Sequence, residues 1–356
     1  MTQRRVVFAL LVLAIGASSM GLIAQSKEEK KKKELQDREI QSIVKVVDEL
    51  TAGQPAANDL SMTWLREDVL KAQGNKEYVP FTVQLDPSKI SGGNVAFYWR
   101  VVAKNPAAPA PAADVKKDDK KKDDKDKAKA PSNYAYEDIS FMPLTAGQTS
   151  MKISRSFTVP AGNYDVFLIA KEPAPEKPAK NAPPAKISAI KQTVNVPDFW
   201  NNELATSSVI VAQRIDPLPA PLTPLQQADR PYALGMMEIL PTFETRFTKK
   251  AELSTFMLIY NPKVDSANKP DVSVEYNFYQ KLAGQPEKFF NKTNPQNLNA
   301  QTLPPNFDFA AGHQLQSGQA VPLASFPEGE YRLEIKVTDK VSSKIVARDV
   351  SFSVAP

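Results

Sequence analysis

The sequence predicts an all-β protein built from two tandem modules of one kind. Near the C-terminus, apolar and polar side chains alternate over residues 331–338, the two-residue period of a strand with one buried face. A Pro-x-Gly-x-Tyr sequence leads into such a strand twice, at residues 160–164 and 327–331. The composition agrees, because 30 prolines against 13 glycines favour β-modules joined by proline-rich loops over helical bundles.

Length and charge limit the classes of function. The 356 residues, 42% of them hydrophobic, suffice for two domains of ordinary size. The net charge of +5 comes from two lysine-rich runs, residues 27–33 and 116–129, which each carry +3 and leave −1 for everything else. A nucleic-acid-binding fold carries its basic face on the folded modules, so nucleic acid is not expected as a partner. The sequence has no cysteine, which excludes disulfides, thiolate metal sites and a cysteine nucleophile.

The N-terminus is predicted to be a secretory signal over residues 1–24. Arg4 and Arg5 precede an apolar run and then small residues, which is the order of regions in such a signal. Cleavage is expected after Ala24, but residues 6–24 are also long enough to span a membrane, so an uncleaved anchor is the alternative. In both cases the protein is expected to be exported, to the periplasm or outside the cell, with membrane contact only through this segment.

Residues 27–52 are predicted to form a helix. Apolar side chains recur at helical spacing from Ile40 to Leu50, and Gly53 followed by Pro55 ends the pattern. We expect this helix to pack on the first module or to act as a stalk. An amphipathic helix that binds a partner or a membrane surface is the alternative.

The first module is predicted over residues 60–198. Its strand at residues 95–102 is apolar on both faces, which indicates a central strand. Two inserts, at residues 104–133 and 172–186, consist largely of Ala, Pro, Lys and Asp. They lack the large apolar side chains that would offset the entropy of ordering, so we expect them to be disordered.

A connector over residues 199–227 is predicted to separate the modules. It contains a strand near residues 207–215 and a proline-rich stretch at 217–224 that should act as a semi-rigid spacer. The second module, residues 228–356, repeats the order of the first: a strand, an Asx-Pro turn, a central strand, a long connection, the Pro-x-Gly-x-Tyr sequence and a terminal hairpin.

These repeated features resemble immunoglobulin-like and fibronectin-type-III-like β-sandwiches, in which a corner tyrosine packs and hydrogen-bonds back along the chain. Residues 205–215 and 322–337 also resemble a group of uncharacterised exported bacterial proteins with paired modules of this kind. The resemblance covers residues 40–356 apart from the inserts, and it implies an architecture but no activity. The structural corner that it implies consists of Pro160, Gly162 and Tyr164 in the first module and Pro327, Gly329 and Tyr331 in the second.

Catalytic and metal-binding chemistry finds little support. His313 is the only histidine, and it lies in a glycine-containing loop without a nucleophile elbow, so we expect a surface-loop histidine. Lysines neighbour the paired aspartates at residues 118–124, which argues against a calcium site. No phosphate loop or dinucleotide fingerprint occurs, so no cofactor is expected. Carboxylate pairs remain open as a source of acid–base chemistry.

Aromatic side chains are the remaining candidates for binding. Residues 97–99 are expected in the core, whereas Trp200, near the module junction, would suit contact with a partner or a glycan. We therefore predict a non-enzymatic exported protein of the cell envelope that acts as a protein-interaction or structural module. A carbohydrate-binding accessory protein is the alternative, and a carboxylate-based hydrolase is the third hypothesis.

Overall fold

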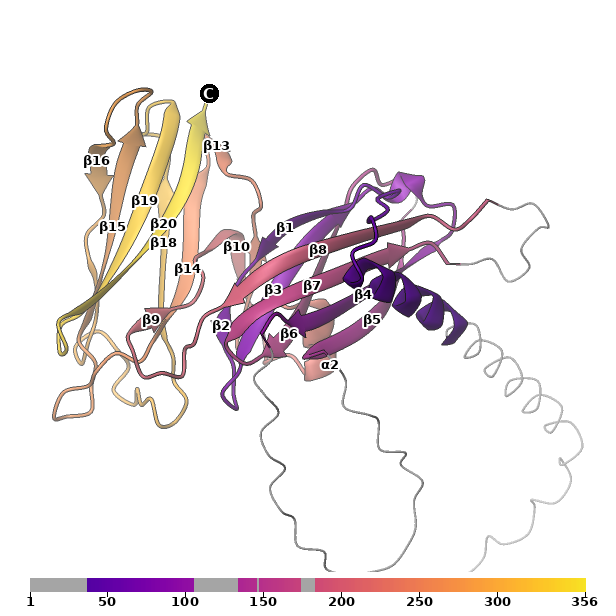
Figure 1. The fold of residues 1–356 in the computed structure, drawn as a ribbon. Helices are drawn as coiled ribbons and strands as arrows, with labels where there is room; N and C mark the ends of the chain where they lie inside the picture. Colours follow the sequence, from indigo (N-terminus) through magenta and orange to yellow (C-terminus); the bar gives the residue numbers. More distant parts are fainter. Residues whose placement is uncertain (1–36, 106–133, 146, 174–182) are drawn as a thin grey trace, which may run out of the picture.

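Two β-sandwiches lie side by side in the computed structural model, which describes residues 37–105, 134–145, 147–173 and 183–356 (Figure 1). Strands dominate both halves of the chain, so the prediction of an all-β fold is confirmed. No helix among the described residues is long and apolar enough to cross a membrane.

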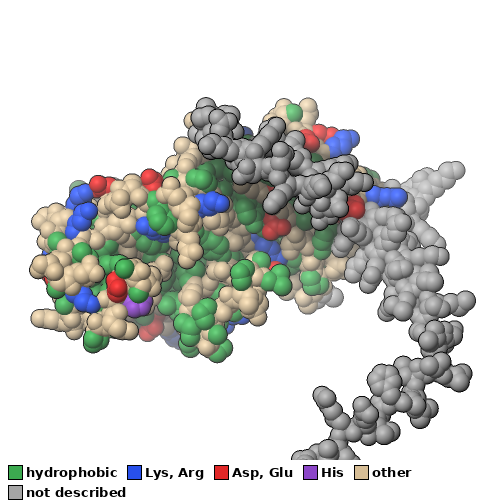
Figure 2. Space-filling model, turned by 90° about the horizontal axis from the view of Figure 1, so that it is seen from below, with side chains coloured by type: hydrophobic (Ala, Val, Ile, Leu, Met, Phe, Trp, Pro, Cys, Tyr) green, Lys and Arg blue, Asp and Glu red, His purple; other side chains and the backbone are tan. Residues whose placement is uncertain are grey.

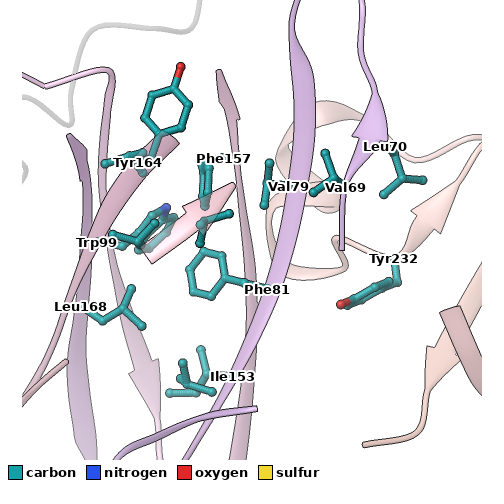
Figure 3. Close-up of a cluster of buried hydrophobic side chains, with 14 of the residues drawn as sticks. Val69, Leu70, Val79, Phe81, Trp99, Ile153, Phe157, Tyr164, Leu168 and Tyr232 are labelled. Carbon is teal, nitrogen blue, oxygen red and sulfur yellow. The ribbon is translucent and has the colours of Figure 1, made fainter. Parts of the chain in front are cut away.

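The first sandwich packs two four-stranded sheets around an aromatic core. The ring of Phe81 lies 6.2 Å from Trp99 and 6.0 Å from Phe157, which joins the two sheets (Figure 3). One sheet consists of β1 (Thr63–Glu67), β2 (Leu70–Lys71), β3 (Glu77–Leu85) and β6 (Met151–Val159), and the other of β5 (Tyr136–Pro143), β4 (Asn94–Ala103), β7 (Gly162–Lys171) and β8 (Ile187–Val196).

A helix over residues 37–51 covers the outer face of the second of these sheets (Figure 1). Its Ile43 and Val47 are fully buried and belong to the same cluster as Tyr98 of β4. The neighbouring residue Trp99 points the opposite way, into the core between the sheets. Strand β4 is therefore apolar on both faces because it lies between two layers, and the described part of the predicted helix packs on the first sandwich.

The second sandwich contains two six-stranded sheets. Tyr331 is fully buried and its ring lies 5.3 Å from both Phe326 and Phe352. One sheet consists of β9 (Ala205–Thr206), β10 (Ile210–Pro217), β11 (Ala233–Leu234), β12 (Met237–Pro241), β14 (Glu252–Tyr260) and β18 (Leu315–Pro322), and the other of β13 (Arg246–Thr248), β15 (Val272–Lys281), β16 (Lys288–Lys292), β17 (Gln296–Leu298), β19 (Gly329–Asp339) and β20 (Lys344–Ala355).

Each sandwich contains the same tyrosine corner. The Tyr164 hydroxyl donates to the Pro160 carbonyl at 2.8 Å, and the Tyr331 hydroxyl donates to the Pro327 carbonyl at 2.8 Å. The glycine between each pair has an unusual backbone angle, with φ of 155° at Gly162 and 147° at Gly329. Side chains with a Cβ rarely adopt such angles, so this position requires glycine in both corners. The recurring five-residue sequence Pro-x-Gly-x-Tyr thus encodes one local conformation twice.

The predicted connector at residues 199–227 contains strands of the second sandwich, including β10 where a strand is expected near residues 207–215. Strand β10 pairs with β14 from Ile210 to Ala212 and with β12 over its remaining length, and β9 also pairs with β14. The second sandwich thus begins near residue 205 and not at 228, because these strands complete its sheet. The proline-rich stretch turns into a short capped helix, α2 (Pro224–Asp229), whose Asp229 lies 3.1 Å from Arg155 of the first sandwich.

The predicted signal segment and most of both inserts lie outside the described residues. Where the second insert was expected to begin, Glu172 is buried, and its carboxylate accepts hydrogen bonds from the backbone of Ser91 at 2.6 Å and Lys186 at 3.3 Å. The ends of this insert are therefore paired residues that continue the β7–β8 hairpin.

Candidate interaction site at the junction of the sandwiches

A buried ion pair links the two sandwiches. Arg66 of β1 donates two hydrogen bonds to Asp68, 2.8 Å from Nε to Oδ2 and 2.6 Å from Nη2 to Oδ1, and Nη2 also donates to the Val209 carbonyl. The Tyr232 hydroxyl of the second sandwich donates to Oδ2 of Asp68 at 2.9 Å. Burial alone would lower the pKa of Arg66, but the hydrogen bonds and charge of Asp68 raise it. Burial and the charge of Asp68 raise the pKa of Tyr232.

Backbone groups of β2 also bind the second sandwich. Ser208 N donates to the Val69 carbonyl at 3.0 Å, and Val69 N donates to Ser208 Oγ at 2.9 Å. Lys71 N donates to the Tyr260 hydroxyl at 3.0 Å. One apolar cluster contains residues of both sandwiches, and Figure 3 shows Tyr232 reaching this cluster from the side opposite Trp99. The junction is therefore a packed and hydrogen-bonded interface. It holds the two sandwiches in one relative position, and so it also sets the shape of any groove that both of them line.

A hollow at this junction has a volume of 670 Å³. Both sandwiches contribute to it, and Figure 2 shows the face on which its single histidine, in purple, lies near hydrophobic side chains in green. We call it the Trp200 groove. Six residues define it. Lys71 comes from the first sandwich, Trp200 follows the last strand of that sandwich, and the second sandwich contributes Tyr260, Val264, Phe309 and His313.

Trp200 is held in place but stays accessible. Its indole Nε1 donates to the Lys76 carbonyl at 3.1 Å, and its backbone N donates to the Asp198 carboxylate at 2.7 Å. The Lys71 ammonium lies 4.2 Å from the centre of the indole ring. The residue is still 36% exposed, as is Val264 across the groove. An immobilised, half-exposed tryptophan loses little entropy when it contacts a partner.

Lys71 connects the tryptophan to the second sandwich. Its Nζ donates to Asn261 Oδ1 at 3.1 Å, and no carboxylate lies within ion-pair distance of it among the described residues. Burial lowers the pKa of Lys71, although the charges of Glu77 and Asp198 oppose this shift. The groove thus presents a cation beside an aromatic ring.

Glu77, at the start of β3, is a fully buried carboxylate close to this groove. Its Oε1 accepts a hydrogen bond from the backbone N of Phe199 at 3.0 Å, one residue before Trp200. Its Oε2 meets no hydrogen-bond donor in the described part of the chain. Burial raises the pKa of Glu77 to about 7, and the Phe199 N–H only partly offsets this effect.

Replacing Glu77 with glutamine is expected to stabilise the protein at about pH 8 by roughly 1–3 kcal/mol, with little effect near pH 5. The folded-state pKa, about 7, lies above the usual 4.5, so ionisation costs more in the folded than in the unfolded protein. This cost is complete above pH 7 and disappears as the pH falls toward about 4.5. Thermal melts across this pH range measure it, with the exposed Glu244→Gln as control. A stability difference that does not change with pH would contradict the prediction.

His313 lies in the Trp200 groove but in an ordinary loop setting. It is exposed, and its Nδ1 accepts a hydrogen bond from the backbone N of Asp308 at 3.0 Å. The imidazole ring also contacts Phe307, with 5.7 Å between ring centroids. The structure therefore gives His313 a role in shaping the loop that forms one wall.

Carboxylates gather in a second hollow at the junction, lined by Glu67, Asp68 and Asp349 among others. Glu67 accepts from the Trp64 indole at 2.6 Å, Asp68 is held by its ion pair, and Asp349 accepts from Arg332 at 2.7 Å. Each of these three carboxylates is thus held in place by at least one hydrogen bond. No group of three or more metal-ligating side chains occurs within the described ranges.

The aromatic residues of the Trp200 groove do not form a flat platform. Tyr260 is buried and packs on Phe199, 4.9 Å between ring centroids, while Phe309 packs edge-on against Phe307 at 5.1 Å. Lys71 covers one face of Trp200 itself. A glycan that stacks on coplanar exposed rings would therefore find a single partly covered ring here.

The site residues differ in how visible they are in the sequence. Trp200 stands out as an aromatic residue outside a strand pattern, and the structure places it at the groove. The ion pair is encoded as Arg66-x-Asp68, a spacing that puts both side chains on one face of an extended segment. Lys71 and Glu77 have no such signal, because each becomes notable only through what the second sandwich places beside it.

No protein-family model matches the sequence, and no curated protein matches it. Among solved structures, Escherichia coli alpha-2-macroglobulin activated by porcine elastase is 11% identical over 80% of this chain, with a TM-score of 0.23. Trypsin-activated alpha-2-macroglobulin from Escherichia coli is 11% identical over 83% of this chain, with a TM-score of 0.22. The chain spans 22% and 16% of the lengths of those two chains. At these TM-scores the similarity says nothing about function.

Proposed function

We propose that the protein is a non-enzymatic interaction module that holds a segment of a protein partner in the Trp200 groove. The observation that carries this proposal is an immobilised, 36% exposed tryptophan in a groove that both sandwiches line. Tryptophans in such settings commonly supply much of the binding energy of an interface. The volume of 670 Å³ lies within the range of roughly 300–1,000 Å³ that is typical of ligand sites.

The chemistry of the groove favours a peptide over a glycan. Its exposed apolar groups, Trp200 and Val264, suit apolar side chains of a partner, and Lys71 beside the indole suits a carboxylate or a backbone carbonyl. The amide of Asn268 also lines the groove and adds hydrogen-bonding capacity. Carbohydrate binding remains the second candidate, because an accessible indole can also stack on a sugar.

We place this module in the cell envelope and assign its sandwiches to the immunoglobulin-like type. The predicted signal at residues 1–24 supports export, and the two tyrosine corners support the assignment of the fold type. Fractionation of cells that express the protein natively tests the location. Recovery in the cytosol at full length would contradict it.

Replacing Trp200 with alanine is expected to weaken partner binding by about 30-fold or more, since central tryptophans commonly contribute about 2 kcal/mol or more. The partner is first captured with a photo-crosslinking residue at Asn268, which is exposed at the groove. Crosslinking from Leu225, which is 84% exposed and does not line the groove, is the control. Titration calorimetry with the purified partner then measures wild type, Trp200→Ala and Leu225→Ala.

Four results would contradict the proposal. Equal affinity of Trp200→Ala and wild type, or no crosslink specific to Asn268, would remove the groove as the binding site. Retention on an insoluble glycan that is lost in Trp200→Ala would favour the carbohydrate-binding function. Substrate turnover abolished by one Asp or Glu substitution would favour the hydrolase.

A further inference from the structure

A second groove lies along β20 at the junction, where residues of both sandwiches line it. Two hollows, of 320 and 350 Å³, share Arg66, Val209 and Asp349 among their lining residues and so lie next to each other along this strand. Apolar side chains line the first hollow, including Phe247 and Val350. We call the two hollows together the β20 groove.

The backbone of β20 faces this groove with unpaired groups. Strand β13 pairs with β20 only from Ser353 to Ala355, and Ser353 N donates to the Thr245 carbonyl at 2.8 Å. N–H directions alternate along a strand, so the amides of every second residue before Ser353 point to the same side. In the described part of the chain none of them has a backbone partner on that side. These residues are Ile345, Ala347, Asp349 and Ser351, of which Asp349 and Ser351 line the hollows and the other two extend the same edge beyond them.

The unpaired part of the β20 edge continues directly from the part that pairs with β13. Strand β13 occupies the last three positions of the edge, and the remaining positions continue in the same row (Figure 1). A long unpaired edge normally attracts another strand, unless proline, charge or a covering loop blocks it. Here Asp349 is the one acidic residue among the outward-pointing positions, and its carboxylate is held by Arg332 at 2.7 Å. Residues 242–247 and part of the first sandwich line the hollows beside Asp349 and Ser351. Ile345 and Ala347 line neither hollow, so a strand can add to the edge from that end.

Charge in the groove indicates what kind of strand fits. The Arg348 guanidinium is only partly exposed, and burial lowers its pKa. It makes two long hydrogen bonds, of 3.4 Å each, to the carbonyls of Ala347 and Thr206, and no carboxylate lies within ion-pair distance in the described ranges. The carboxylates that line the groove are those of Glu67, Asp68, Glu244 and Asp349, and none of them lies within ion-pair distance of Arg348. Arg348 is thus a partly desolvated cation that lacks an anion.

We propose that the β20 groove accepts an extended segment of a partner protein, which adds as a strand to the free edge and places an acidic side chain on Arg348. Alternate side chains of that segment would point toward Val209, Phe247 and Val350, because side chains alternate between the faces of a strand. The carboxylate would replace two weak contacts by a charge-assisted hydrogen bond. This site is separate from the Trp200 groove and rests on the proposed function only in requiring a polypeptide partner.

A random dodecapeptide library displayed on phage and selected on the full-length protein is the probe. We expect the selected peptides to alternate apolar and polar residues and to share one acidic position. Their binding should protect the amides of Ile345, Ala347, Asp349 and Ser351 from hydrogen exchange, and not those of the residues between them. This alternation distinguishes strand addition from binding elsewhere in the groove.

Two variants test the two parts of the site. Ala347→Pro removes one outward N–H without touching the bonds to β19, and it should weaken peptide binding about tenfold or more. Arg348→Gln should abolish the preference for an acidic residue, while a peptide with Gln at that position binds both proteins alike. Thermal melting checks that each variant folds. If Ala347→Pro does not fold, the pattern of amide hydrogen exchange in the wild-type protein with bound peptide decides the question.

Several outcomes would overturn the inference. These are failure to enrich any peptide, binding that Ala347→Pro leaves unchanged, and protection that does not alternate along β20. Loss of binding in Trp200→Ala but not in Ala347→Pro would place the peptides in the Trp200 groove, which would support the proposed function and refute this site. Concentration-dependent dimerisation lost in Ala347→Pro would show that a second copy of the chain occupies the edge instead.

Discussion

Replacing Tyr331 with alanine is expected to lower the free energy of unfolding of the second sandwich by about 3–5 kcal/mol, which is a large part of the stability of a typical domain. The ring is fully buried and packs against Phe326 and Phe352 at 5.3 Å and against Phe290 at 5.5 Å. Its removal leaves a cavity among aromatic rings and also leaves the Pro327 carbonyl without its donor. Urea denaturation followed by circular dichroism measures the loss.

Two further substitutions separate the contributions of Tyr331. Tyr331→Phe keeps the ring and loses one hydrogen bond, so it should cost about 0.5–1.5 kcal/mol. Glu334→Ala, on the same strand but facing solvent, should cost about 0.5 kcal/mol or less. Tyr164→Ala should destabilise the first sandwich in the same way. If Tyr331→Ala melted at the wild-type temperature, the corner would have no structural role.

Replacing Asp68 with alanine is expected to destabilise the junction by about 3–5 kcal/mol, because a partly buried guanidinium and a buried hydroxyl then lose their acceptor. Arg66 and Tyr232 come from different sandwiches and both depend on this fully buried carboxylate. We expect calorimetry to show a single transition in the wild type and two separated transitions in the variant. Hydrogen exchange at Val69 and Ser208, whose bonds cross the junction, should accelerate at the same time.

A matched double variant tests this explanation. Arg66→Met combined with Asp68→Leu removes both charges and keeps their volume, so it should be less harmful than Asp68→Ala alone. If Asp68→Ala left one cooperative transition at the wild-type temperature, the ion pair would not couple the sandwiches. The comparison therefore distinguishes an orphaned charge from a mere loss of packing.

The strands of the fold are readable from local patterns, whereas the boundary between the sandwiches is not. The alternation that starts at Tyr331 and the apolar run around residues 95–102 correspond to β19 and β4. The sequence predicts a strand near residues 207–215, which corresponds to β10, and a spacer only at residues 217–224, because proline usually marks a loop. Proline also tolerates the end of a strand, and Pro217 is the last residue of β10. Local sequence therefore could not distinguish a linker from a strand that completes a distant sheet.

The candidate site shows the same division. Trp200 was predicted from its own position, because a large aromatic side chain outside a strand needs an explanation. Glu77 occupies an ordinary place in β3, and only the Phe199 backbone and the second sandwich make it a buried carboxylate. The role of Arg348 likewise depends on a strand edge whose pairing stops at Ser353. Residues whose chemistry depends on contacts far away in the chain cannot be found from local periodicity.

Strand β14 is buried on both faces, and this has a consequence for the duplicated modules. Met257 and Ile259 face the core of their own sandwich, whereas Phe256, Leu258 and Tyr260 belong to the apolar cluster of the first. The two modules therefore cannot be separated without loss. A fragment that begins at residue 228 would lack two strands of its sheet, and it would expose three large apolar side chains to water. Each copy of the repeat therefore shields apolar side chains of the other from water, so either copy produced alone is expected to expose them and to aggregate.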